Sequence, residues 1–114
     1  MGAGESRFTA LRGRLLPGAA EGYIRAHDQI PQQLSDAQRD AGVRRWLIFQ
    51  DGLDLFHVAD CEDFDNSMRL LAEDPTDQSW QREMAGYKQP VDDQGNTETR
   101  LTLIYDRDLW LPRG

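Results

Sequence analysis

The sequence is poor in cysteine and contains no long hydrophobic run, and each shortage excludes a class of protein. The single cysteine, Cys61, cannot form an internal disulfide, and we expect a buried thiol in a protein of the reducing cytosol. No run approaches the roughly 20 apolar residues of a membrane-spanning helix, and the first residues have no apolar segment of signal-peptide length. We therefore expect a soluble, cytoplasmic protein without a membrane partner.

Positive charge is also scarce. Thirteen Lys and Arg residues stand against twenty Asp and Glu residues, so the formal charge is -7. An acidic chain repels phosphate backbones, and we therefore expect no nucleic-acid partner. Two histidines and one cysteine at no recognisable spacing do not supply the ligands of a zinc site, so we predict no metal. At 114 residues, we expect residues 1–114 to form one domain around one core.

The first half of the chain reads as a strand followed by a broken helix. Phe8–Leu16 mixes apolar and basic residues before the turn at Pro17-Gly18, and we predict a strand there. Apolar residues at helical spacing follow over residues 19–41. Pro31 interrupts this stripe, because proline removes a backbone donor, so we expect a kink or two short helices. Gly42 should end the helical segment.

A hairpin and a second helix come next. Val43–Gln50 and Leu53–Cys61 are rich in β-forming residues and flank Asp51-Gly52, a strong hairpin signal. A helix should begin near Asp63 and end before Asp74-Pro75. We interpret the acidic residues at its start as helix capping, since carboxylates favour that end of a helix. They are Asp60, Glu62, Asp63 and Asp65.

The last third contains one more helix and one more strand. The helix is predicted from Thr76, and Asp92–Thr97 reads as a mobile surface loop. Alternating apolar residues predict a strand over Thr99–Tyr105, with Leu109-Trp110-Leu111 packing near the end of the chain. The order β, α, β, β, α, α, β matches a ferredoxin-like α+β fold, an antiparallel sheet with helices on one face.

The uncovered face of such a sheet predicts a homodimer. A one-sided sheet exposes its second apolar face, and large exposed apolar patches usually mark interfaces. We therefore expect two copies of the chain to pack face to face or to share strands.

Tyr23 and His27 begin the apolar stripe that precedes Pro31. A helix would place both polar tips on its buried face, and each tip would then need a hydrogen-bond partner in the protein or in a ligand. The spacing alone leaves open whether His27 is a structural or a catalytic histidine. The other histidine, His57, alternates with Leu55 and Ala59 in a predicted strand. It could line the same cavity, but we expect a structural or exposed role.

Six short motifs follow one another in an order that is typical of one family. They are Pro17, Tyr23-Ile24-Arg25-Ala26-His27 with Ile30, Gly42 with Trp46, Asp74-Pro75 with Gln78-Ser79-Trp80, Gln89-Pro90, and Leu109-Trp110-Leu111-Pro112. Over nearly its whole length the chain thus resembles the L-rhamnose mutarotase family, dimeric α/β-barrel proteins that interconvert the α and β anomers of a sugar.

The resemblance implies a role for five side chains. It makes His27 the catalytic acid/base and Tyr23 a sugar contact, and Trp46 stands where the family has a second-strand tyrosine. The family's paired tryptophans fall on Trp80, which matches, and on Gln81, which does not. Aromatic rings at such positions can stack on the apolar face of a sugar, whereas Gln81 replaces stacking with hydrogen bonding.

One further departure concerns the segment after the histidine. Family members usually have Ile-Trp-Pro there, whereas this chain has Ile30-Pro31-Gln32, so we expect a changed pocket rim.

Anomer exchange needs proton transfer and no cofactor, because the ring opens and closes without oxidation or group transfer. A histidine can give and take the proton at neutral pH, which makes His27 the candidate general acid/base. The expected substrate is a deoxyhexose such as L-rhamnose or L-fucose. Two alternatives stay open. One is a cofactor-free cyclase or oxygenase of specialised metabolism, and the other is a non-catalytic ligand-binding homologue.

Overall fold

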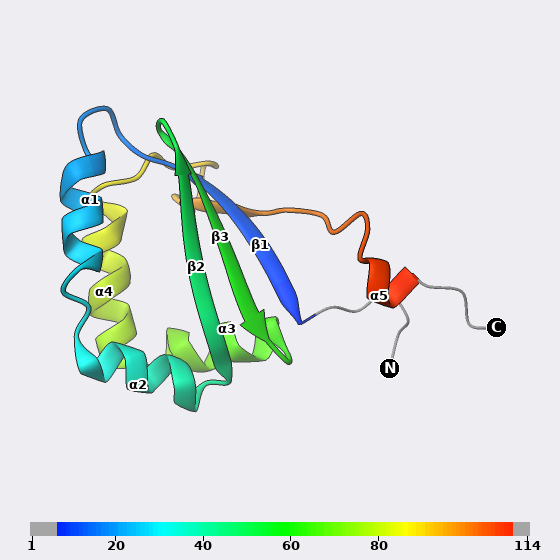
Figure 1. The fold of residues 1–114 in the computed structure, drawn as a ribbon. Helices are drawn as coiled ribbons and strands as arrows, with labels where there is room; N and C mark the ends of the chain where they lie inside the picture. The colour runs from blue at the N-terminus through cyan, green and yellow to red at the C-terminus, as the bar shows by residue number, and fades with distance from the viewer. Residues whose placement is uncertain (1–6, 111–114) are drawn as a thin grey trace.

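A computed structural model describes residues 7–110 and contains a four-stranded antiparallel sheet that carries helices on one face (Figure 1). The strands are β1 Phe8–Arg14, β2 Val43–Asp51, β3 Asp54–Cys61 and β4 Glu98–Arg100. The helices are α1 Ala20–His27, α2 Gln32–Asp40, α3 Phe64–Ala72, α4 Pro75–Ala85 and α5 Arg107–Trp110. The strand order β2-β3-β1-β4 confirms the predicted ferredoxin-like α+β fold. No helix within residues 7–110 is both long and apolar enough to cross a membrane.

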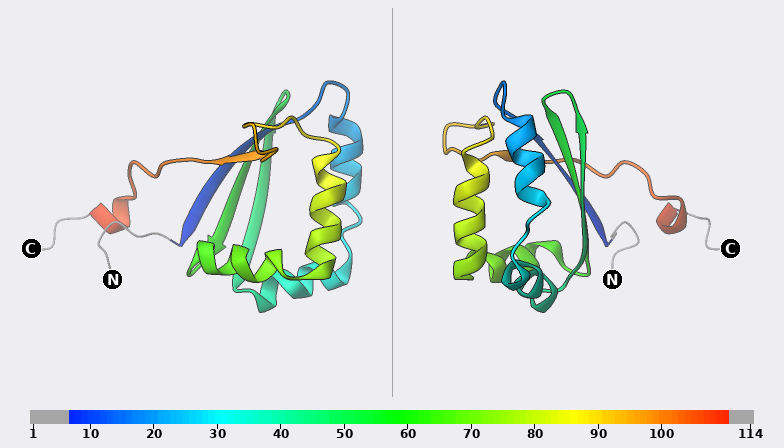
Figure 2. Two further views of the ribbon diagram at one scale, coloured as in Figure 1. Left: turned by 180° about the vertical axis from the view of Figure 1, so that it is seen from behind. Right: turned by 60° about the vertical axis from the view of Figure 1, so that its left-hand side comes forward.

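Prolines divide each helical connection of this fold into two helices. Pro31 separates α1 from α2 with φ -61° and ψ 140°, an extended conformation outside the helical range. Pro75 is the first residue of α4, where its missing N–H is tolerated, and the Asp74 side chain accepts a hydrogen bond from the backbone N–H of Asp77 at 3.0 Å. Both breaks were expected from the sequence. As a result α1 and α4 lie side by side, and α2 and α3 cross the end of the sheet where β2 begins (Figure 2).

Two glycines with positive φ mark the ends of β2. Gly42, with φ +94°, follows α2 and ends the helical segment as predicted. Gly52, with φ +61°, lies in the hairpin loop. The sequence predicts this loop at Asp51-Gly52, whereas in the structure it is Gly52-Leu53, because Asp51 still pairs with Asp54. Glycine at the first loop position suits a type II′ turn, which needs a positive φ there.

The strands at the two ends of the chain are shorter than predicted. β1 ends at Arg14 rather than Leu16, because its partner strand β3 begins at Asp54, opposite Arg14; Leu15 forms an isolated bridge with Lys88 instead. β4 ends at Arg100, whereas the alternating pattern predicts a strand to Tyr105. Beyond β4 the chain runs away from the helices (Figure 1). The expected packing of 109–111 reaches beyond the described residues.

Side chains alternate between the two faces of β3. Leu55, His57, Ala59 and Cys61 are at most 4% exposed under the helices. The intervening side chains, such as Phe56, lie on the face without helices, where the neighbouring strand β2 adds Phe49, 56% exposed. The helices thus bury one face of the sheet only.

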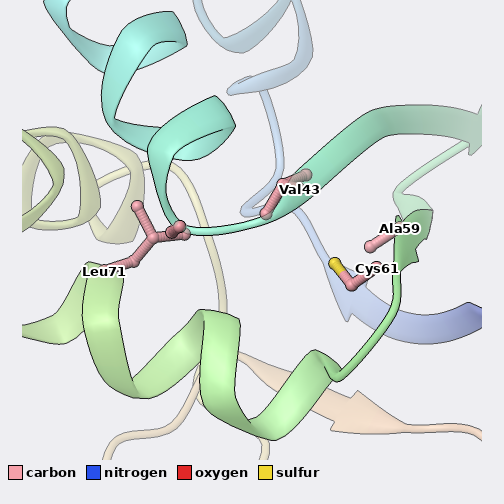
Figure 3. Close-up of a cluster of buried hydrophobic side chains, with 5 residues drawn as sticks. Val43, Ala59, Cys61 and Leu71 are labelled. Atoms are coloured by element: carbon pink, nitrogen blue, oxygen red, sulfur yellow. The ribbon is translucent and has the colours of Figure 1, made fainter.

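Two clusters of buried side chains form the core on the helix-covered face. The first joins α2, β2, β3 and α3 (Figure 3); its members are Ala41, Val43, Ala59, Cys61 and Leu71. The second joins β1, α1, β3 and α4; its members are Leu15, Tyr23, Leu55 and Met84. Cys61 is a free thiol inside the first cluster, which confirms the predicted buried cysteine.

The acidic residues at the start of α3 were predicted to cap it, and this holds for Asp63 and for Asp65 in the first turn but not for Asp60 and Glu62. Asp63 caps α3, since its side chain accepts a hydrogen bond from the backbone N–H of Asn66 at 3.0 Å. The other three carboxylates form ion pairs with arginines from other elements. These pairs are Asp60 with Arg7, Glu62 with Arg44, and Asp65 with Arg100.

Two adjacent leucines provide a direct test of the second core cluster. We predict that Leu15→Ala lowers the free energy of unfolding by about 3 kcal/mol, because Leu15 is fully buried and its removal leaves a cavity. Leu16→Ala is the matched control and should cost under about 1 kcal/mol, since Leu16 is 39% exposed. Urea unfolding followed by tryptophan fluorescence measures both values. Equal losses in the two variants would contradict this account of the core.

Candidate active site

A cavity of about 590 Å³ lies between the helix-covered face of the sheet and the helices. Its wall borders both core clusters, through Leu71 of the first and Met84 of the second. Small-molecule sites in proteins have volumes of roughly 300 to 1,000 Å³, so this cavity has the size of such a site. The five residues that the sequence predicts for the site all line it: Tyr23, His27, Trp46, Trp80 and Gln81.

His27 is the last residue of α1, and its ring is fixed by the backbone of its own helix. Nδ1 lies 2.8 Å from the carbonyl oxygen of Tyr23. A carbonyl oxygen can only accept, so Nδ1 carries a proton and donates it. In the neutral ring, Nε2 then keeps its lone pair and can accept a proton. The half-buried imidazole forms a T-shaped contact with Trp80, with the ring centroids 5.2 Å apart.

Tyr23 is a member of the second core cluster and also lines the cavity. Only 3% of it is exposed, and its ring lies 4.4 Å from that of His27 and 6.0 Å from that of Tyr87. Burial, together with the negative charge of Glu98, raises the pKa of Tyr23 above its ordinary value of about 10. The phenol therefore stays neutral at physiological pH and can act as a hydrogen-bonding group, not as a base.

The two tryptophans reach the cavity from opposite sides. Trp46 comes from β2 and stacks on Phe64 with an interplanar angle of 27°. Trp80 comes from the middle of α4 and contacts His27. Both are half-buried, so each ring supports the core while it lines the hollow. Gln81, the next residue of α4, is exposed to solvent at the wall.

Asp77 is a carboxyl group in the cavity wall that sequence reasoning missed. It is 6% exposed, and Oδ1 accepts a hydrogen bond from Nε2 of Gln81 at 3.4 Å. Burial raises the pKa of Asp77, which the hydrogen bond from Gln81 only partly offsets. A carboxyl with a raised pKa in an aromatic-walled cavity is a candidate for proton transfer. In the sequence, an aspartate in the first turn of a helix indicates only helix capping, so nothing marked Asp77 as a site residue.

A buried ion pair, also missed, closes one side of the cavity. The Nζ of Lys88 lies 2.8 Å from Oε2 of Glu98, and the lysine side chain is only 4% exposed. Oε2 also accepts from the Thr97 hydroxyl at 2.6 Å, and Nζ lies 5.6 Å from the centre of the Tyr23 ring. Burial alone would raise the pKa of Glu98, but Lys88 outweighs it and the pKa is lowered. The pair is therefore charged, and each charge neutralises the other.

His57 lines the cavity from the centre of the sheet, on β3. It is 4% exposed, so the expectation of an exposed role does not hold. The indole N–H of Trp46 donates to its Nδ1 at 3.1 Å. Burial is the main cause that lowers the pKa of His57 to about 4, and Lys88 adds to it, so the ring is neutral at physiological pH.

Besides the Lys88–Glu98 ion pair, the wall therefore offers the proton-accepting Nε2 of His27, the carboxyl of Asp77 and several aromatic faces. A neutral His27 can remove a proton from a hydroxyl, Asp77 can supply one, and the tryptophans can hold an apolar face of the ligand. No group of three or more histidine, cysteine, aspartate or glutamate side chains in residues 7–110 comes close enough together to hold a metal ion.

Comparisons with known proteins point to one family. The sequence profile described as L-rhamnose mutarotase matches residues 9–106. The solved structure of an L-rhamnose mutarotase from Formosa agariphila is similar, with a TM-score of 0.72 and 23% identity over 89% of this chain and 98% of that chain. The fold is shared more widely. Tetracenomycin F2 cyclase from Streptomyces glaucescens, a type-II polyketide cyclase, has a TM-score of 0.63 and 18% identity over the same fractions, 89% and 98%. No curated protein sequence matches the chain.

The lowered pKa of His57 predicts a loss of stability on acidification. Between about pH 7.5 and pH 5 the unfolded chain binds a proton at a histidine of pKa about 6.5, whereas folded His57, with a pKa of about 4, does not. Stability therefore falls as the pH falls, by about 2 kcal/mol. Urea unfolding at both pH values should show that His57→Gln loses about 2 kcal/mol less than the wild type. The same pH dependence in both proteins would contradict a buried, neutral His57.

Proposed function

This chain belongs to the L-rhamnose mutarotase family, and we propose that it exchanges the α and β anomers of a deoxyhexose such as L-rhamnose or L-fucose, with His27 as the general acid/base. The observation that carries the proposal is the state of the His27 ring. Because Nδ1 donates to the Tyr23 carbonyl, the proton-accepting nitrogen of His27 is Nε2, on a residue that lines an aromatic-walled cavity.

The proposed reaction has two proton transfers and a rotation. His27 Nε2 removes the proton of the anomeric hydroxyl while the ring oxygen gains a proton, and the bond between the anomeric carbon and the ring oxygen breaks. The aldehyde rotates, and the ring closes on its other face as the protons return. Asp77 is the group in the wall suited to supply the second proton, because burial raises its pKa.

The remaining predicted residues would bind the sugar. Trp80 and Trp46 offer aromatic faces for the C–H side of a pyranose, and the hydroxyls would reach Tyr23 and Gln81. Trp80 contacts the imidazole of His27, so a sugar stacked on its face would lie next to the proposed base.

A cofactor-free cyclase or oxygenase, or a binding protein without activity, is the alternative. Gln81 is the feature that favours it, because an amide stands where the family has its second aromatic platform. The likeness to the polyketide cyclase reflects the fold and does not by itself favour cyclisation.

Saturation-transfer NMR between the two anomeric protons tests the activity directly. We expect accelerated exchange for at least one of L-rhamnose, L-fucose, D-galactose and D-glucose. His27→Ala should reduce the enzymatic rate by about 100-fold to 10,000-fold, because the positioned acid/base is lost. Gln29→Ala, an exposed position two residues away, is the matched control and should keep the full rate. No acceleration with any of the four sugars would refute the mutarotase, and a fully active, folded His27→Ala would remove His27 from the mechanism.

We also propose that the chain acts as a cytoplasmic homodimer formed through the helix-free face of the sheet. Phe49 on that face is 56% exposed, and beyond β4 the exposed side chains include Leu103 and Ile104, which is 86% exposed. The predicted strand over Thr99–Tyr105 has the alternation of a β-strand, but β4 ends at Arg100, with one further backbone hydrogen bond from Leu101 to Ala10 at 2.8 Å. A second copy could provide the edge strand for the rest, as in shared-strand dimers. The single free thiol of Cys61 supports the cytoplasmic location.

A charge on the helix-free face should separate the two copies. Sedimentation equilibrium of the wild type should give twice the mass of one chain. Phe49→Glu should shift the equilibrium to monomers, because a carboxylate would be buried without a partner at the interface. Ile24→Glu is the control, since Ile24 is 50% exposed on α1, on the other side of the sheet. A monomeric wild type, or an unchanged Phe49→Glu dimer, would contradict this interface.

A further inference from the structure

His57 has one ring nitrogen whose role is fixed by a neighbouring donor. The indole Nε1–H of Trp46 can donate but not accept, and it lies 3.1 Å from Nδ1 of His57. Nδ1 must therefore be the accepting nitrogen. The proton of the neutral ring is then on Nε2, on the side of the imidazole opposite to Trp46.

This Nε2–H is buried in the cavity wall and has no protein partner in the described part of the chain. Buried polar groups in folded proteins are almost always hydrogen-bonded, so a single unpartnered donor needs an explanation. The nearby carboxylate of Glu98 does not provide one, because Nε2 forms no hydrogen bond with it, and its Oε2 accepts from Lys88 and from Thr97 instead. An acceptor that enters the cavity would satisfy the donor.

We propose that His57 is a specificity-determining residue whose Nε2–H donates a hydrogen bond to an oxygen atom of the bound sugar. The inference rests on the proposed function, since it assumes a carbohydrate in this cavity. A donor on a rigid central strand recognises a hydroxyl or ring oxygen at one position and disfavours a methylene there, because the donor would again be unpaired.

The chemistry of the ring assigns His57 to recognition and not to proton transfer. Its low pKa keeps the imidazole neutral, and a neutral imidazole N–H is a hydrogen-bond donor but a very weak acid. Trp46 acts as a positioning residue for this donor. The resemblance places a tyrosine at that position, and here the N–H of the tryptophan is directed at His57.

Histidine-selective NMR tests the donor directly. In protein labelled with nitrogen-15 in histidine, the ring nitrogens of His57 should show the Nε2–H form, and Trp46→Phe should weaken this preference. Titration with the panel sugar that exchanges fastest, or with L-rhamnose if none does, should shift the Nε2–H signal downfield as the hydrogen bond forms. A His57 ring protonated at Nδ1 would overturn the proposal. So would a sugar that binds without shifting the Nε2–H signal, because the donor would then be bonded to an ordered water and not to the sugar.

Two variants separate recognition from structure. His57→Phe removes the donor, and His57→Gln can both donate to a sugar and accept from Trp46. We expect His57→Phe to raise KM, or the Kd measured by tryptophan fluorescence, by about tenfold to 100-fold with a smaller change in kcat, and His57→Gln to restore most of the affinity. Folding of each variant is checked by urea unfolding.

Monodeoxy analogues of the same sugar identify the bonded oxygen. The wild type should bind one analogue about tenfold or more weakly than the parent sugar. His57→Phe should bind that analogue and the parent sugar with equal affinity. The pattern of outcomes distinguishes this inference from the proposed function. If sugar affinity depends on His57 but no anomer exchange occurs, the recognition role of His57 is supported and the mutarotase activity is refuted. If anomer exchange occurs and folded His57→Phe keeps the KM and analogue selectivity of the wild type, only the role of His57 is refuted.

Discussion

Polar groups have to be paired wherever the helices cover the sheet, and this constraint shapes the cavity. An unpaired buried donor or acceptor costs about 1 to 3 kcal/mol, and a lone buried charge costs more. The chain meets it at most positions with pairs from different elements: Lys88 with Glu98 at 2.8 Å, and Trp46 with Nδ1 of His57 at 3.1 Å; Nε2 of His57 is left without a partner in the described residues. These pairs bring the loop after α4, the edge strands β4 and β2, and the central strand β3 to one wall. Pairing thus lowers the cost of the polar groups in the cavity wall, and the unpaired Nε2 of His57 is the exception.

The aromatic rings give the same wall its second property. Trp80 forms a T-shaped contact with His27, and Tyr23 contacts both His27 and Tyr87. Rings packed in this way restrict one another, so the imidazole has little freedom to turn away from the cavity. The proline before α2 contributes from the other side, because it ends α1 at His27 and leaves the histidine at a helix terminus rather than within a continuous helix.

The fold could be predicted from the sequence where proline, glycine and turn residues mark the ends of helices and strands. The site residues could be predicted only where the resemblance to a family implies a role for them. Pro31, Gly42 and the Asp51-Gly52 hairpin mark element boundaries through backbone chemistry that does not depend on distant residues. The strand over Thr99–Tyr105 was predicted too long, because alternation indicates a strand but cannot indicate which chain pairs with it. Lys88 was not foreseen either. A single lysine is unremarkable in a sequence, and its burial becomes visible only when the structure brings Glu98 to it across a loop.

The two histidines show how one residue type can take opposite roles in one cavity. At His27 a carbonyl oxygen faces Nδ1, which must therefore be protonated, so Nε2 can accept a proton. At His57 an indole N–H faces Nδ1, which must therefore be unprotonated, so Nε2 carries the hydrogen. The partner atom alone makes the difference, since both rings are half or fully buried and both line the same wall. In the proposed reaction, the acceptor nitrogen of His27 would move a proton at one oxygen of the sugar. The donor nitrogen of His57 would hold another oxygen in place.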